Sequence, residues 1–109
     1  MLRKNIVQTL DAATSWKVFG LDLAKHDLAV VAIPADGSEV QYVKRYSYAD
    51  FLEFTAQIPS ATMVFEPGNG ANHFALRLQA QGHTPKMVSQ VRNCNPCISH
   101  YHAIKLETW

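Results

Sequence analysis

Two carboxylates of this chain lie in apolar surroundings that are unusual for charged side chains. Asp22 lies within VFGLDLAK (residues 18–25), and Glu66 lies within MVFEPG (residues 63–68). Moving a carboxylate into an apolar environment costs free energy unless a hydrogen-bond partner or a metal ion compensates. Because carboxylate oxygens are preferred ligands of Mg²⁺ and Mn²⁺, the two segments predict a metal site on Asp22 and Glu66 if they form neighbouring strands.

A carboxylate pair of this kind is typical of sites that transfer phosphoryl groups. Two bound ions about 4 Å apart can activate an attacking oxygen and stabilise the leaving one. Such a site usually has more than two carboxylates, and only Asp22 and Glu66 have convincing positions here. A structural role stays open for each: Asp22 as a strand-end residue bonded to backbone amides, and Glu66 as a loop or helix-capping residue.

Four residues that follow the carboxylate segments are candidates for DNA binding. Lys25 could contact phosphate, although a surface lysine is the commoner explanation. Asn69 and Asn72 lie at a predicted helix start, where free backbone amides attract anions, and an ordinary helix start is the alternative. His73 could lie near a nucleic-acid strand or be a partly exposed helix residue.

A second cluster of possible metal ligands lies near the carboxyl end of the sequence. CNPC (residues 94–97) is followed by His100 and His102. The spacing is unusually compact for a structural zinc site, and the motif does not open a helix after a strand as a redox motif would. Two cysteines, Cys94 and Cys97, are also too few for a disulfide scaffold. These features argue against zinc and more strongly against a redox role, and zinc stays open as an alternative.

The hydrophobic pattern predicts the elements that would position the two carboxylates. The predicted strands are residues 16–23, 28–33, 39–46, 62–65 and 85–88, and the predicted helices run from the cap Ser47 to Pro59 and from Ala71 to Gln81. Three strands in a meander are followed by two helical crossovers, which make parallel neighbours. The strand at 62–65 can then lie beside the strand at 16–23. This order predicts an α/β domain with a mixed sheet, for which the ribonuclease-H-like fold is one of several options.

Composition indicates one small domain or part of a larger protein. The 109 residues are 48% hydrophobic and 17% charged, with a net charge of +1, which supports a packed core and neither indicates nor excludes a local basic patch. The sequence has no apolar run long enough for a bilayer and no signal-peptide pattern, so we expect a cytoplasmic protein without a membrane partner. We divide it into a loose leader (1–15), the α/β domain (16–90) and a divergent tail (91–109).

Three segments resemble the catalytic domain of the DEDD transposases of bacterial insertion sequences, a group that includes the pilin-gene invertases. They are FGLDLAK (19–25), VFEPGNG (64–70) and LRLQAQGHTPKMV (76–88). The resemblance implies a ribonuclease-H-like fold similar to that of the RuvC resolvase, with four acidic residues that bind Mg²⁺ and act on DNA. By motif match, Asp22 is the first of the four and Glu66 the second.

The sequence departs from the family after the last matching segment. It has no aspartate after Asp50, so the third and fourth acidic residues are missing, as is the second family domain with its serine. We therefore expect an incomplete, truncated or frameshifted N-terminal fragment of a transposase, with weak or absent Mg²⁺ or Mn²⁺ binding and no activity alone. The family implies insertion-sequence ends as the DNA partner, a guide RNA in some relatives, and oligomers of the full-length protein.

Two other function classes stay open on the sequence alone. A sugar-kinase-type ATPase fragment would also place an aspartate on its first strand, but no glycine-rich phosphate hairpin follows Asp22. A non-enzymatic binding module with zinc on the tail cysteines would contain metal as purified. Weak Mg²⁺ or Mn²⁺ binding that is lost in Asp22→Ala would favour the transposase interpretation over the zinc module.

Overall fold

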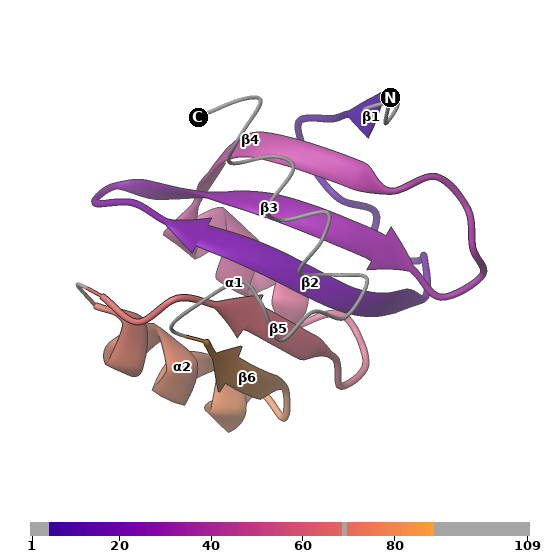
Figure 1. Cartoon of the computed structure of the whole chain (residues 1–109). Helices are drawn as coiled ribbons and strands as arrows, with labels where there is room; N and C mark the ends of the chain where they lie inside the picture. The colour runs from indigo at the N-terminus through magenta and orange to yellow at the C-terminus, as the bar shows by residue number, and fades with distance from the viewer. Residues whose placement is uncertain (1–4, 69, 89–109) are drawn as a thin grey trace.

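The apolar segments in the first half of the chain form three consecutive antiparallel strands. In the computed structural model, which describes residues 5–68 and 70–88, these are β2 (Trp16–Leu23), β3 (Asp27–Pro34) and β4 (Gln41–Ser47). Figure 1 shows them side by side as the centre of the sheet. β3 is buried along nearly its whole length, which explains its continuous apolar sequence, whereas β4 exposes Lys44 and Arg45.

Two helical crossovers complete the sheet with parallel strands. α1 (Tyr48–Thr55) leads to β5 (Thr62–Phe65), and α2 (Ala71–Ala80) leads to β6 (Thr84–Met87). The strand order is β1-β4-β3-β2-β5-β6, with β5 parallel to both β2 and β6. The prediction of an α/β domain with a mixed sheet, and of the strand at 62–65 parallel to the strand at 16–23, is therefore confirmed.

The segment before β2 contributes more to the fold than its weak pattern indicated. β1 (Asn5–Ile6) pairs in parallel with β4, with Ile6 opposite Tyr42, and Leu10 is only 7% exposed in the core. The weak pattern of residues 1–15 predicts a loose leader, and a strand of two residues is too short to show a period that would indicate it. Its place is decided by pairing with a strand that is distant in sequence, which local pattern does not report.

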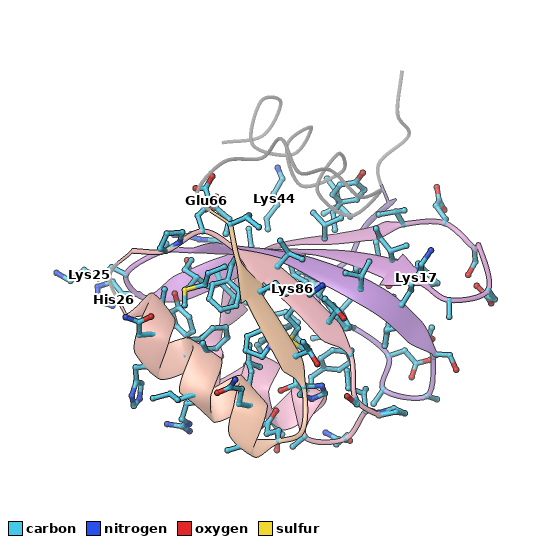
Figure 2. The ribbon with its side chains drawn as sticks, turned by 60° about the horizontal axis from the view of Figure 1, so that its bottom comes forward. Lys17, Lys25, His26, Lys44, Glu66 and Lys86 are labelled. Carbon is cyan, nitrogen blue, oxygen red and sulfur yellow. The ribbon has the colours of Figure 1, made fainter. Side chains whose placement is uncertain are left out.

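Both helices cover the same face of the sheet, as Figures 1 and 2 show from two directions. Aromatic side chains fill the layer between helices and sheet. The Phe51 ring of α1 lies 6.3 Å from the Phe19 ring of β2, and the Phe74 ring of α2 lies 5.9 Å from the Phe65 ring of β5. Both pairs are edge-to-face, a favourable arrangement for aromatic rings. The core therefore holds β2 and β5, the two strands that carry Asp22 and Glu66, against both helices.

A buried histidine connects the end of α1 to the start of the last two strands. His83 is 4% exposed, and its Nδ1 accepts a hydrogen bond from the Ala61 backbone N–H at 3.1 Å. The proton must then be on Nε2, which donates to the Thr55 carbonyl at 2.7 Å. This single neutral tautomer satisfies two buried backbone groups and fixes the turn before β6.

Neither helix in the described part of the chain is both long and apolar enough to cross a membrane.

Candidate metal and nucleic-acid site

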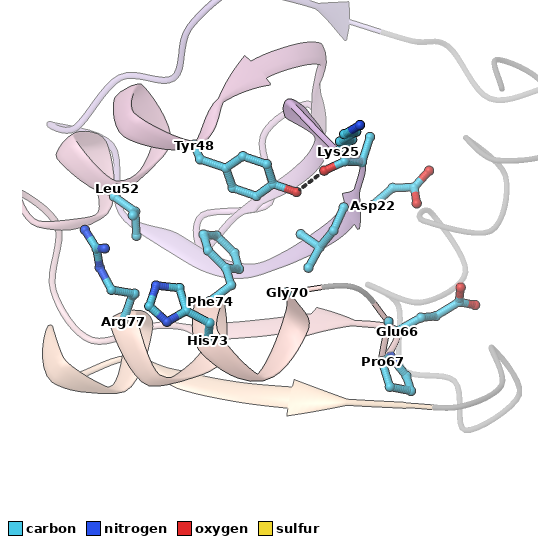
Figure 3. Close-up of a pocket in the computed structure, with 13 residues that line it drawn as sticks. Asp22, Lys25, Tyr48, Leu52, Glu66, Pro67, Gly70, His73, Phe74 and Arg77 are labelled. Carbon is cyan, nitrogen blue, oxygen red and sulfur yellow. Dashed lines mark hydrogen bonds between the residues drawn. The ribbon is translucent and has the colours of Figure 1, made fainter.

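The pairing of β2 with β5 brings the two predicted carboxylates to one end of the sheet. The parallel register joins Val18 to Thr62 and continues to Leu21 opposite Phe65. Asp22 directly follows Leu21, and Glu66 directly follows Phe65. Because side chains alternate along extended backbone, and Leu21 and Phe65 both point into the helix-side core, Asp22 and Glu66 leave the backbone in the same direction. Figure 3 shows both residues at one end of a pocket, with their carboxylates pointing away from Tyr48, His73 and Arg77.

That pocket has a volume of about 730 Å³ and is formed by the ends of two strands and the facing sides of two helices. Its lining residues come from the β2–β3 turn, α1, the loop after β5, and α2: Asp22, Leu23, Ala24, Lys25, Tyr48, Leu52, Glu66, Pro67, Gly68, Gly70, His73, Phe74 and Arg77. Asp22 and Glu66 are both half-buried. The volume is within the range of roughly 300–1,000 Å³ that is typical of small-molecule sites.

The structure brings some of the predicted DNA-binding residues to this pocket and leaves others apart. Lys25, from the β2–β3 turn, and His73, from the first turns of α2, both line it and are exposed. Asn72 is exposed on α2 and does not line the pocket. Asn69 lies outside the described residues. Asp22, Glu66, Lys25 and His73 therefore line one pocket, with the two carboxylate residues at one end and His73 at the other.

The backbone between Glu66 and α2 turns through a glycine. Gly70 is the N-cap of α2 and has φ 78°, in the left-handed region that other residues rarely adopt. The Gly70 carbonyl accepts the first bond of the helix from the Phe74 N–H at 2.9 Å. A glycine at this position thus allows α2 to start close to the end of β5 and to place His73 and Phe74 in the pocket.

The sequence pattern did not identify four residues of the pocket wall. Tyr48 and Leu52 are one turn apart on α1, and Phe74 and Arg77 are on α2. The Tyr48 hydroxyl donates to the Ala24 carbonyl at 2.5 Å, and its ring meets the Phe74 ring edge-to-face at 5.3 Å. The spacing of Tyr48 with Leu52, and of His73 with Arg77, was a usable signal, because residues four apart share a helix face.

Tyr48 also connects the pocket to the turn that carries Lys25. Burial raises the pKa of Tyr48 above its ordinary value, and the negative charges of Asp27 and Asp22 raise it further. The hydroxyl therefore stays protonated at neutral pH, where it serves as the hydrogen-bond donor to Ala24 rather than as a base.

The carboxylate oxygens of Asp22 and Glu66 fit a hard divalent cation such as Mg²⁺, bound weakly. Mg²⁺ is commonly held by one or two carboxylates, with water and substrate phosphate completing its octahedral shell. Within residues 5–68 and 70–88, no group of three or more His, Cys, Asp or Glu side chains is placed to hold a metal ion. Asp22 and Glu66 could thus supply part of the shell of one ion. The alternative zinc ligands Cys94, Cys97, His100 and His102 lie outside the described residues.

Comparison with known proteins assigns no family to the chain. No family model, no curated protein and no solved structure matches the chain. The functional interpretation therefore depends on the carboxylate pair and on the pocket beside it.

Proposed function

We propose that this chain is a ribonuclease-H-like domain of the DEDD transposase type, which binds Mg²⁺ or Mn²⁺ on Asp22 and Glu66 and contacts DNA of insertion-sequence ends. The observation that carries the proposal is the parallel register of Leu21 with Phe65, since it places the two carboxylates next to each other at one end of the sheet. In this function the chain acts in the cytoplasm, where such DNA lies.

The order of the strands supports this assignment. An antiparallel meander of β2, β3 and β4 is followed by β5 and β6, which are added in parallel on the other side of β2. This is the order that the resemblance to DEDD transposases leads one to expect. The first acidic residue then belongs to the central strand β2 and the second to the end of β5, as in the motif match.

The number of carboxylate ligands at the site determines whether the domain can cleave DNA or only bind it. A bound divalent cation would supply positive charge for phosphate oxygens, and Lys25 would add a second positive group beside it. Cleavage with two ions uses further ligands, and the sequence has no aspartate after Asp50. We therefore propose that the chain alone binds DNA and divalent metal weakly and has little or no strand-transfer activity. A guide RNA and an oligomeric state are further features that the resemblance implies for the family.

A Mn²⁺ titration followed by electron paramagnetic resonance tests the metal site directly. The expected result is weak binding that decreases at least about tenfold in Asp22→Asn and in Glu66→Gln, since each substitution removes a charged ligand. Glu39→Gln is the matched control, because Glu39 is exposed in the turn before β4 and distant from the pocket in sequence and fold. Equal Mn²⁺ binding by all four proteins would disprove the site. Efficient Mg²⁺-dependent cleavage or joining of element-end DNA by the purified chain would contradict the proposal that it has little or no strand-transfer activity.

A further inference from the structure

We infer that the pocket beside Asp22 and Glu66 receives one unstacked nucleotide of a single DNA strand, with its base between α1 and α2 and its phosphate toward Lys25 at the strand ends. This inference rests on the proposed function, because DNA is the partner that function requires. It adds the residues Tyr48, Leu52, Phe74 and Arg77 to the contact surface and states which form of DNA they accept.

The walls of the pocket between the helices are apolar and partly aromatic. Tyr48 and Leu52 are half-buried on α1, and Phe74 is 5% exposed on α2. The hydrogen bond from Tyr48 to Ala24 and the ring contact between Tyr48 and Phe74 hold the aromatic wall in place. The whole pocket, with its polar lining included, has a volume of about 730 Å³, which is enough for a nucleobase to lay its flat apolar face on this wall.

Groups able to carry positive charge surround this apolar wall. Figure 3 shows His73 and Arg77 beside Leu52 at the end of the pocket away from the carboxylates. Lys25 lies on the turn at the other side, and Figure 2 shows Lys25 together with His26 at the end of the molecule where α2 begins. Arg77 and His73 are exposed, one turn apart on α2, and line the pocket. A cationic groove with aromatic surfaces is the usual arrangement in proteins that bind single strands.

The two ends of the pocket suit the two parts of a nucleotide. Lys25 lines the pocket at the end formed by the β2–β3 turn, where its ammonium group can pair with a phosphate. The planar guanidinium of Arg77 and the imidazole of His73 can stack on or hydrogen-bond to a base at the Leu52 end. In an intact duplex the bases are paired and stacked, so only a base outside the stack can enter the pocket between the helices.

Fluorescence anisotropy with a short labelled thymidine oligonucleotide, measured in EDTA and again in Mg²⁺, tests the inference. Leu52→Trp fills the pocket without a change of charge, and Leu76→Trp is its control because Leu76 is 64% exposed on α2 and outside the pocket. Arg77→Ala removes a pocket cation, and Lys86→Ala removes an exposed cation of β6. We expect Leu52→Trp and Arg77→Ala to weaken binding about fivefold or more, and the two controls to bind within about twofold of the unsubstituted chain.

The same series separates a base in the pocket from phosphate contact alone. An oligonucleotide of abasic sites should bind about fivefold more weakly than the thymidine strand, and should be insensitive to Leu52→Trp. Equal binding of both oligonucleotides, equal binding by Leu52→Trp and Leu76→Trp, or tighter binding of ATP than of the oligonucleotide would overturn the inference. Arg77 is exposed, so Arg77→Ala keeps the test decisive if Leu52→Trp fails to fold.

Failure of the inference and failure of the proposed function give different results. Leu52→Trp and Arg77→Ala should leave Mn²⁺ binding unchanged, because neither residue is a carboxylate ligand. If Mn²⁺ binding requires Asp22 and Glu66 but the pocket variants bind DNA normally, the metal site stands and the nucleotide pocket is wrong. If the oligonucleotide binds through the pocket but Asp22→Asn leaves Mn²⁺ binding intact, the metal site is wrong.

Discussion

Leu21 and Phe65 are register partners on the parallel strands β2 and β5, and both are fully buried. This pairing is the structural reason that Asp22 and Glu66 lie at the same end of the sheet. A shift of one residue in either strand would move one carboxylate to the opposite face, because the side-chain period of a strand is two. The packing of Leu21 and Phe65 against the helices therefore fixes the metal site indirectly.

The register of β2 with β5 predicts which amide signals in a nuclear magnetic resonance spectrum bound Mn²⁺ should broaden. Amide signals near Asp22 and Glu66 should broaden first as Mn²⁺ is added. Signals of Trp16 should stay sharp, since six residues of extended strand place it about 20 Å from Asp22. Titration with Mg²⁺ should reverse the broadening by competition. Broadening centred on any other part of the sheet would place the ion elsewhere.

Replacement of His83 tests the connection between α1 and β5. His83→Ala should lower the free energy of unfolding by about 2 kcal/mol, because it leaves the Ala61 N–H and the Thr55 carbonyl buried without their partner. Urea unfolding followed by circular dichroism measures the change. His26→Ala, in the exposed β2–β3 turn, is the matched control and should change stability by less than about 0.5 kcal/mol. Equal stability of the two variants would contradict the assigned bonds.

The start of α1, which carries Tyr48 into the pocket, depends on a side-chain cap. The Ser47 hydroxyl accepts a hydrogen bond from the Asp50 N–H at 3.0 Å. Ser47→Ala should therefore destabilise the chain by about 1 kcal/mol, and Ser47→Asp should restore most of the loss, since aspartate is an equally good cap. Thermal unfolding compares the two with Ser15→Ala, a substitution of an exposed serine before β2. A loss in Ser47→Asp as large as in Ser47→Ala would argue against a capping role.

Tyr48 makes stability depend on alkaline pH. Its pKa is raised by burial and then by Asp27 and Asp22, so the neutral phenol is favoured in the folded state. The stability that this raised pKa contributes is fully present below about pH 10, the ordinary tyrosine value, and is lost as the pH rises through the higher folded value. Tyr48→Phe should therefore reduce the stability lost as the pH rises above about 10, measured by urea unfolding.

Tyr46 and Asp22 provide two controls for the alkaline loss of stability assigned to Tyr48. Tyr46 also has a pKa raised mainly by burial, so some loss should remain in Tyr48→Phe. In Asp22→Asn, Tyr48 should ionise at lower pH than in the unsubstituted chain, because one of the negative charges that oppose its ionisation is gone. Tyrosinate absorbance follows the titration. An unchanged or higher midpoint in Asp22→Asn would contradict the electrostatic contact.

Local pattern was sufficient for the elements near the carboxylates. The bounds of β2 and β5 were predicted as observed, because each is a short apolar run between polar or glycine-containing turns. The helix starts were marked by Ser47 and by Pro67 to Gly70, whose preferences act within a few residues. The third strand was predicted from Glu39 but begins at Gln41, since a turn and a strand edge have similar composition.

The sequence by itself determined the α/β class, the strand and helix order and the candidate pair Asp22 and Glu66, because periodicity, caps and isolated charges are local properties of the chain. Only the tertiary structure decided the pairing of β1 with β4, the burial of His83 and the pocket between Tyr48, Leu52, Phe74 and Arg77. These depend on contacts between residues that are distant in sequence. Such contacts are set by how the helices pack on the sheet, which no single segment encodes.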